Sequence, residues 1–222
     1  MSIQSQVENL LSELRGQGIW DQRVLEALRR VPREMFVPAE MRRHAFRNIP
    51  LPIGEGQTIS QPFVVALMSQ ALALAEDEKV LEVGTGSGYQ SAVLAELCRE
   101  VVSVERIGFL ARQARSRLAQ LQYSNVRVYE GDGSLGWPDE APYDGIIATA
   151  AGPSAPRALL DQLADGGRLV LPIGPHFSQE LYLYQRRGEE ILTTRLGSVR
   201  FVPLIGDAAW SEQEASRFPV EE

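Results

Sequence analysis

The chain has 222 residues, of which 44% are hydrophobic, and its 29 acidic and 22 basic residues give a net charge of −7. This length fits one sizeable domain, and the acidic excess argues against a broad nucleic-acid surface, which needs basic residues to meet phosphate. Residues Met1–Leu11 show no signal-peptide pattern, and no apolar run reaches the ~18 residues of a membrane span, so we expect a cytoplasmic protein without a membrane partner.

The amino-terminal sixty residues predict a helical extension. A first helix is expected over residues 3–15, with Val7, Leu10, Leu11 and Leu14 on one face. Asp21 can cap a second helix, which should end near Val31 because Pro32 follows. Residues 47–60 contain four glycines or prolines and predict an irregular loop. A helix should then run from about Gln61 to Leu74.

From Lys79 onward, short apolar strands alternate with helical patterns. Strands are predicted at Val80–Val83, Val101–Glu105, Val126–Tyr129, Gly145–Ala148 and Arg168–Ile173. Helices are predicted at Gln90–Leu97, Gly108–Leu121 and Pro156–Leu163, the last with Ser154 as its cap. Strands separated by helices imply a mostly parallel sheet that is covered on both faces.

The last two predicted strands, Leu181–Gln185 and Ile191–Phe201, are separated by too few residues for a crossover helix. They predict an antiparallel hairpin at the sheet edge. The fold class is therefore α/β, doubly wound, with a helical amino-terminal extension. We divide the single domain 1–222 into an extension and substrate loop (1–60), a core (61–206) and an acidic tail (207–222), which we expect to be disordered.

A glycine-rich loop directly follows the first strand of the core, in the sequence Glu82-Val83-Gly84-Thr85-Gly86-Ser87-Gly88-Tyr89. Such glycines let the backbone turn tightly and approach a ligand at the carboxyl end of a strand. The dinucleotide pattern G-x-G-x-x-G fails because Tyr89 stands at its third glycine. Glu82 would repel a pyrophosphate, whereas the ammonium of a methionine moiety would favour a nearby acid.

Two further acids mark the ends of the next two strands: Glu105 is the last residue of one, and Asp132 follows the other. Glu105 can accept hydrogen bonds from ribose hydroxyls. The Asp132 carboxylate can accept from an adenine amino group, and the amide of Gly133 can donate to a ring nitrogen. For either acid alone, a solvated strand end is an equally good interpretation. Together with the glycine loop they indicate an adenosine-containing ligand.

Metal and thiol chemistry find little support in the sequence. His44 and His176 lie far apart, and neither has a partner at a metal-ligand spacing. The single cysteine, Cys98, follows an apolar stretch, which predicts a small core thiol. We therefore expect no metal.

Several motifs resemble the bacterial-type protein-L-isoaspartate O-methyltransferase family over roughly Val7 to Gly206. They are Val31-Pro32-Arg33-Glu34 with Phe36-Val37, Pro52–Pro62, the glycine loop, Ser103–Arg106, Gly131–Gly133, Ala141–Asp144, Gly166–Val170 and Arg200–Leu204. The Gln57–Pro62 and Arg200–Leu204 segments are not general features of methyltransferases. One departure is Gln122, where such proteins often have glycine at a helix end.

The resemblance implies a Rossmann-like methyltransferase. It would transfer a methyl group from S-adenosyl-L-methionine to the free α-carboxylate of L-isoaspartyl residues in damaged proteins and peptides, leaving S-adenosyl-L-homocysteine. The methyl ester then closes to a succinimide, whose hydrolysis returns some normal aspartate. The implied cofactor residues are Thr58, Ile59, Glu82, Gly84, Thr85, Gly86, Ser87, Gly88, Glu105, Arg106, Asp132 and Gly133. The implied substrate residues are Ser60, Val202, Pro203 and Leu204.

Ser60 has two interpretations on chemistry alone. Its hydroxyl could donate a hydrogen bond to the substrate carboxylate beside a helix amino terminus, which favours an anion. It could equally cap the helix that begins near Gln61. The resemblance favours the first, because the matching serine of the family is its active-site residue.

Val202-Pro203-Leu204 resembles the segment that covers the substrate in the family. An extended peptide could pair with backbone groups near Val202 by strand addition, which reads main chain rather than side chains. An edge strand that simply ends at a proline is an equally good interpretation of the sequence.

Two other functions remain open at this point. A methyltransferase of the same fold with another substrate would keep the glycine loop, Glu105 and Asp132, but has no reason to carry both Gln57–Pro62 and Arg200–Leu204. A non-catalytic adaptor that binds the cofactor would be expected to lose Ser60 or to acquire a partner-binding extension.

Overall fold

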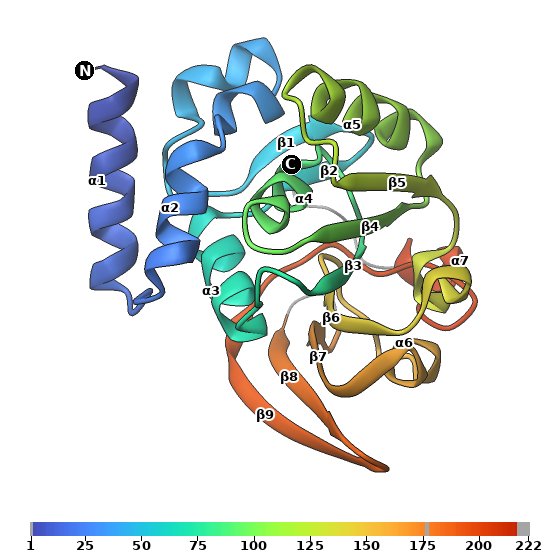
Figure 1. Cartoon of the computed structure of the whole chain (residues 1–222). Helices are drawn as coiled ribbons and strands as arrows, with labels where there is room; N and C mark the ends of the chain where they lie inside the picture. The colour runs from blue at the N-terminus through green and yellow to red at the C-terminus, as the bar shows by residue number, and fades with distance from the viewer. Residues whose placement is uncertain (1, 176–177, 217–222) are drawn as a thin grey trace.

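The computed structural model describes residues 2–175 and 178–216. A seven-stranded sheet with the order β5-β4-β3-β6-β7-β8-β9 forms its centre, and a separate two-stranded sheet pairs β1 with β2. Helices cover both faces of the large sheet (Figure 1). The predicted doubly wound α/β fold is therefore confirmed.

The amino-terminal extension begins with α1 (Ile3–Gly16) and α2 (Gln22–Arg30), as predicted. Leu10, Leu11 and Leu14 are buried. The Asp21 side chain caps α2 by accepting from the amides of Arg23 and Val24. Two 3-10 helices, η1 (Arg33–Phe36) and η2 (Ala39–His44), follow them in the extension.

The expected irregular loop over residues 47–60 is wrong in part, because β1 (Leu51–Gly54) and β2 (Gln57–Ile59) form a short antiparallel hairpin there. The φ angles of Gly54, Glu55 and Gly56 are 94°, 53° and 67°, so the glycines make the turn of the hairpin. Strands this short carry too little alternation to be distinguished from a loop by sequence.

The first five strands of the large sheet run parallel: β3 (Lys79–Val83), β4 (Glu100–Glu105), β5 (Val126–Glu130), β6 (Tyr143–Ala148) and β7 (Leu163–Ile173). The last two, β8 (Gln179–Arg187) and β9 (Glu190–Val199), are antiparallel. This confirms the predicted hairpin, which projects from the edge of the sheet (Figure 1).

The helices α3 (Pro62–Leu72), α4 (Tyr89–Ala95) and α5 (Gly108–Gln120) pack on one face of the sheet together with the extension. The other face carries α6 (Arg157–Asp161) and the 3-10 helices η3 (Gly133–Leu135) and η4 (Pro138–Glu140). The expected Ser154 cap is wrong. The N-cap of α6 is Pro156, without a side-chain hydrogen bond, and the helix ends early because Leu163 already pairs with β6.

The beginning of the acidic tail is ordered, which contradicts the expected disorder for residues 207–216. The amides of Asp207 and Ala208 donate to the side chains of Asp132 and Ser134, and Trp210 Nε1 donates to the Ala151 carbonyl. A capping box starts the short helix α7 (Glu212–Ala215). These bonds reach residues distant in the sequence, so composition did not reveal them. Residues 217–222 lie outside the described part of the chain.

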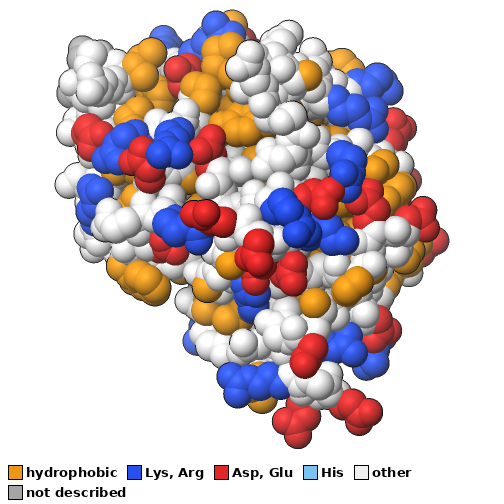
Figure 2. Space-filling model, viewed as in Figure 1, with side chains coloured by type: hydrophobic (Ala, Val, Ile, Leu, Met, Phe, Trp, Pro, Cys, Tyr) orange, Lys and Arg blue, Asp and Glu red, His pale blue; other side chains and the backbone are white. Residues whose placement is uncertain are grey.

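Acidic and basic side chains are interspersed over the face of the molecule drawn in Figure 2. Within the residues that the structure describes, no helix is both long enough and apolar enough to cross a membrane.

Candidate active site

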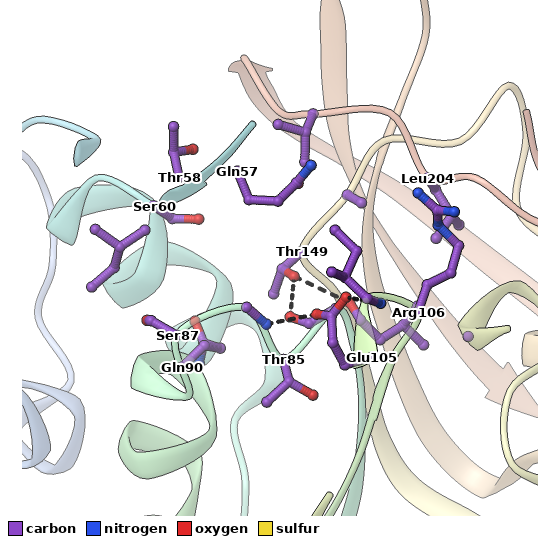
Figure 3. Close-up of a pocket in the computed structure, with 18 of the residues that line it drawn as sticks. Gln57, Thr58, Ser60, Thr85, Ser87, Gln90, Glu105, Arg106, Thr149 and Leu204 are labelled. Carbon is purple, nitrogen blue, oxygen red and sulfur yellow. Dashed lines mark hydrogen bonds between the residues drawn. The ribbon is translucent and has the colours of Figure 1, made fainter. Parts of the chain in front are cut away.

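A cavity opens at the carboxyl ends of β3, β4 and β6, where open α/β sheets bind ligands (Figure 3). It brings together thirteen of the predicted site residues: Thr58, Ile59, Ser60, Gly84, Thr85, Gly86, Ser87, Glu105, Arg106, Gly133, Val202, Pro203 and Leu204. Three others, Glu82, Gly88 and Asp132, do not line it. Segments from the extension, the core and the carboxyl-terminal region therefore meet at one place.

The shape of the glycine loop depends on a close neighbour, Thr149, directly after β6. Thr149 Oγ1 donates to the carbonyls of Val83 and Gly84, at 3.2 and 2.6 Å. A Cβ atom at Gly84 would lie 2.4 Å from that oxygen, and the φ of Gly84 is 93°. Any other residue would both clash and strain the backbone there. Gly88, outside the cavity, is the N-cap of α4 and also has a positive φ, of 88°.

Glu105 is a fixed carboxylate in the cavity wall. Its Oε2 accepts from the Gly86 amide at 2.8 Å and its Oε1 from the Ile107 amide at 2.9 Å. The residue is 6% exposed. Because each carboxylate oxygen can accept a second hydrogen bond, Glu105 keeps acceptor capacity for the hydroxyls of a ligand.

Glu82 lies behind the loop rather than in the cavity. It is fully buried, and its Oε2 accepts from the hydroxyls of Ser91 and Ser103. The Ser103 hydroxyl also bonds to Thr85 Oγ1 at 2.6 Å, so the network reaches the loop. Burial raises the pKa of Glu82 to about 8. The predicted direct contact of Glu82 with a cofactor ammonium is therefore corrected to a position beneath the loop.

Asp132 and Gly133 are neighbours in the sequence, but only one of them lines the cavity. Gly133 lines the cavity, whereas the Asp132 carboxylate faces the carboxyl-terminal segment. Its Oδ1 accepts from the amide and hydroxyl of Ser134, and its Oδ2 accepts from the Asp207 amide at 2.7 Å. The expected adenine contact of Asp132 remains a prediction that the cavity wall does not support.

Ser60 is half-buried and lines the cavity, between β2 and α3. Its side chain is drawn with the glycine loop and Glu105 in Figure 3. The N-cap of α3 is Gln61, without a side-chain cap, and Ser60 makes no side-chain hydrogen bond to the described part of the chain. The Phe63 amide instead donates to Asn48 Oδ1 at 2.9 Å. The interpretation of Ser60 as a helix cap is therefore wrong.

The Val202–Leu204 segment is already paired on one side. The Ala151 amide donates to the Val202 carbonyl and the Leu204 amide donates to the Ala151 carbonyl, both at 2.8 Å. A peptide could therefore pair only with other backbone groups near Val202, and strand addition there stays a prediction. The side chains of the segment remain part of the cavity wall.

Several cavity residues were missed by the sequence interpretation: Gln57, Val65, Val83, Tyr89, Gln90, Val104, Ile107, Thr149, Ala150 and Ile205. Thr149 and Ala150 could have been found, because they follow β6 as Gly84 follows β3. The others come from strands, helices and the carboxyl-terminal segment, and only the folded chain brings them to one cavity.

The remaining candidates lie elsewhere. Cys98 is buried, its thiol donates to the Leu94 carbonyl, and burial raises its pKa to about 12, so the predicted core thiol is confirmed. His44 accepts a hydrogen bond from Arg43 Nε at 2.9 Å. His176 lies outside the described residues.

A family model described as protein-L-isoaspartate(D-aspartate) O-methyltransferase matches residues 5–209. The chain is 54% identical over 199 residues to protein-L-isoaspartate O-methyltransferase 1 of Syntrophobacter fumaroxidans, covering 90% of this chain and 93% of the relative. It is 52% identical over 198 residues to the protein-L-isoaspartate O-methyltransferase of Methanoculleus marisnigri, covering 89% and 90%.

Solved structures agree over most of the chain. A protein-L-isoaspartate O-methyltransferase superposes with a TM-score of 0.82 at 28% identity, covering 91% of this chain and 67% of that one. A Plasmodium falciparum structure described as a protein of the same kind, in complex with S-adenosyl-L-homocysteine, superposes with a TM-score of 0.78 at 26% identity, covering 89% and 97%.

Proposed function

Because the chain belongs to the protein-L-isoaspartate O-methyltransferase family, we propose that its cavity binds S-adenosyl-L-methionine beside an isoaspartyl carboxylate that Ser60 holds. The protein is an S-adenosylmethionine-dependent methyltransferase that acts on the free α-carboxylate of L-isoaspartyl residues in damaged proteins. The proposal therefore concerns which residues of this chain carry out that reaction.

The cavity fits the cofactor chemically. Gly84 and Gly86 allow close approach of the ligand to the backbone, and Glu105 presents a carboxylate that two amides hold in place. Thr58, Ile59, Thr85, Ser87, Arg106 and Gly133 line the same space. When bound, S-adenosyl-L-methionine supplies a methyl group on a sulfonium, which is an excellent leaving group. Glu82 would support the loop through Ser103 and Thr85 rather than touch the cofactor.

The substrate supplies its own nucleophile. A carboxylate of ordinary pKa near ~4 is ionised at neutral pH, so no general base is needed. The remaining task of the protein is alignment of the two reactants, which is worth ~7–11 kcal/mol in favourable intramolecular systems. Ser60 suits this task because its hydroxyl can donate one hydrogen bond and has no competing partner in the described chain.

A neutral donor is better suited here than a cationic clamp. The attacking carboxylate loses negative charge as the bond to the methyl carbon forms, so strong anion binding would stabilise the ground state more than the transition state. Arg106 does line the cavity, but its Nη1 pairs with Glu212 at 3.0 Å. Glu212 thereby partly neutralises the positive charge that Arg106 presents to the cavity.

One observation carries the proposal: an unbonded serine hydroxyl and a backbone-held carboxylate lie in the walls of one cavity (Figure 3). Glu105 accounts for the cofactor side of the reaction and Ser60 for the substrate side. We extend the proposal to a cytoplasmic protein that needs no metal and acts on isoaspartyl-containing proteins and peptides, without nucleic-acid or membrane partners. The acidic excess of the sequence supports the absence of nucleic acid.

A radiolabelled methyl-transfer assay tests this function directly. The purified protein is given labelled S-adenosyl-L-methionine and either an isoaspartyl peptide or the same peptide with normal aspartate. We expect base-labile label on the isoaspartyl peptide alone. Equal label on both peptides, or none on either, would contradict the proposed substrate.

A further inference from the structure

Arg33 is a charged residue that is almost completely buried. It lies in η1 of the amino-terminal extension and is 1% exposed. Its Nε donates to the Ala45 carbonyl at 2.9 Å, and its Nη2 donates to the Ser60 carbonyl at 2.7 Å. The guanidinium carbon lies 4.6 Å from the centre of the Tyr89 ring.

These contacts join three parts of the chain around the cavity. Ala45 belongs to the extension, Ser60 stands at the corner between β2 and α3, and Tyr89 is the first residue of α4 after the glycine loop. Ser60 and Tyr89 both line the cavity, on its substrate and cofactor sides. The planar fork of a guanidinium can hold two carbonyls and stack on a ring at the same time, which an ammonium cannot do.

The charge is retained at an energetic cost. A buried cation loses its hydration, and an ion pair usually compensates for that loss. In the described part of the chain Arg33 has no salt bridge, and its buried Nη1 has no hydrogen-bond partner. An apolar side chain would fill the same space without this penalty. The contacts that distinguish arginine from such a side chain are those to Ala45, Ser60 and Tyr89.

A second residue of the extension, besides Arg33, contacts the corner between β2 and α3 at which Ser60 lies. The first turn of α3 lacks a cap of its own, and Asn48 of the extension accepts from the Phe63 amide. Arg33 and Asn48 thus hold both sides of this corner. Since the Ser60 hydroxyl is unbonded, its position is set by the backbone of Ser60, whose carbonyl Arg33 binds.

We propose that Arg33 is a positioning residue for methyl transfer, which acts by holding the backbone of Ser60 at the cavity. This inference rests on the proposed role of Ser60. It assigns the amino-terminal extension a part in the reaction, because the extension supplies the group that sets the substrate-binding hydroxyl. Arg33 itself touches neither reactant.

A double-mutant cycle tests this role. The wild type, Arg33→Met, Ser60→Ala and the double variant are compared for kcat/KM toward an isoaspartyl peptide. We expect Arg33→Met to lower kcat/KM at least tenfold in the wild-type background and less than threefold in the Ser60→Ala background. Residues that act as a unit show such non-additivity, whereas independent structural effects add.

Arg168 offers a matched control at the other end of α3. It also donates to two carbonyls, those of Leu72 and Ala73, although it pairs with Glu78 as well, and it lies outside the cavity. Arg168→Met should lower the melting temperature and leave kcat/KM within twofold of wild type at a temperature where both are folded. If Arg33→Met does not fold, Arg33→Lys replaces it in the same cycle, since lysine keeps the charge but cannot bind both carbonyls and stack.

The outcomes separate this inference from the proposed function. Equal fold-losses from Arg33→Met in both backgrounds would overturn the positioning role while the wild type still methylates the peptide. A Ser60→Ala variant as active as the wild type would refute the role of Ser60 and this inference with it. Absence of transfer by the wild type would refute the function itself.

Discussion

Ser60 does not cap α3, because the side chain of Asn48 accepts the hydrogen bond from the Phe63 amide in the first turn of that helix. We therefore expect Ser60→Ala to lower methyl transfer tenfold or more, about 1.4 kcal/mol in the barrier, with a melting temperature near that of the wild type. Cofactor affinity should change little, because the hydroxyl is assigned to the substrate.

Asn48→Ala is the matched control for that substitution. It removes the acceptor for the Phe63 amide and should cost about 1 kcal/mol of stability, as loss of a cap does. The two variants are compared by thermal unfolding and activity on the same preparations. A lowered melting temperature in Ser60→Ala with full activity would return the serine to a structural role.

Glu105 is expected to bind the ribose of the cofactor. Glu105→Ala should weaken binding of both S-adenosyl-L-methionine and S-adenosyl-L-homocysteine by roughly 1–3 kcal/mol, because hydroxyls of the ligand lose their acceptor. Calorimetry measures both affinities. Glu130→Ala is the control, since Glu130 pairs in register with Glu105 at the end of the next strand and lies outside the cavity. Equal effects of the two substitutions would remove Glu105 from the site.

At the scale of elements, the carboxyl end of α5 has a non-glycine residue, Gln122, in a left-handed backbone conformation. Gln122 has a φ of 64°, and the amides of Gln122 and Tyr123 donate to the carbonyls of Ala119 and Leu118. This is the hydrogen-bond pattern of a helix end that normally has glycine at the left-handed position. The departure noted in the sequence at Gln122 therefore corresponds to backbone strain.

Gln122→Gly should increase the free energy of unfolding by roughly 0.5–1 kcal/mol, because relief of the left-handed strain exceeds the flexibility that glycine adds to the unfolded chain. Gln120→Gly, two residues earlier at the last position of α5, is the matched control. It should destabilise the protein by a similar amount. Chemical denaturation measures both, and a loss of stability in Gln122→Gly would show that the glutamine side chain contributes more than the strain costs.

At the scale of the whole molecule, the buried Glu82 links stability to pH. Its pKa is raised from 4.5 to about 8 by burial, so the folded state keeps a proton that the unfolded state has lost in this interval. Stability without cofactor should therefore fall as pH rises from about 4.5 to about 8. The side chain of Glu82→Gln stays neutral at every pH. The slope of its free energy of unfolding against pH should therefore be smaller in this interval, by up to the equivalent of one proton. Parallel denaturation profiles for the two proteins would contradict the assignment.

The antiparallel hairpin and the β1–β2 hairpin show which elements are visible in a sequence. The strands of the first were predicted because β8 and β9 have nine and ten residues and a short connection. The strands of the second have four and three residues, and their glycines and prolines resembled a loop. The ordered start of the tail was missed for another reason, since Asp132, Ser134 and Ala151 hold it from distant parts of the chain.

The sequence alone determined the order of strands and helices in the core, the glycine loop, the acid Glu105 at the end of a strand, and the resemblance that led to Ser60. These features depend on local periodicity and on motifs of neighbouring residues, which a chain carries whether or not it is folded. Only the tertiary structure decided that Glu82 and Asp132 lie outside the cavity, that Asn48 caps α3, and that Arg33 reaches Ser60. Their roles depend on the direction of a side chain and on partners far away in sequence, which are set when the sheet is packed.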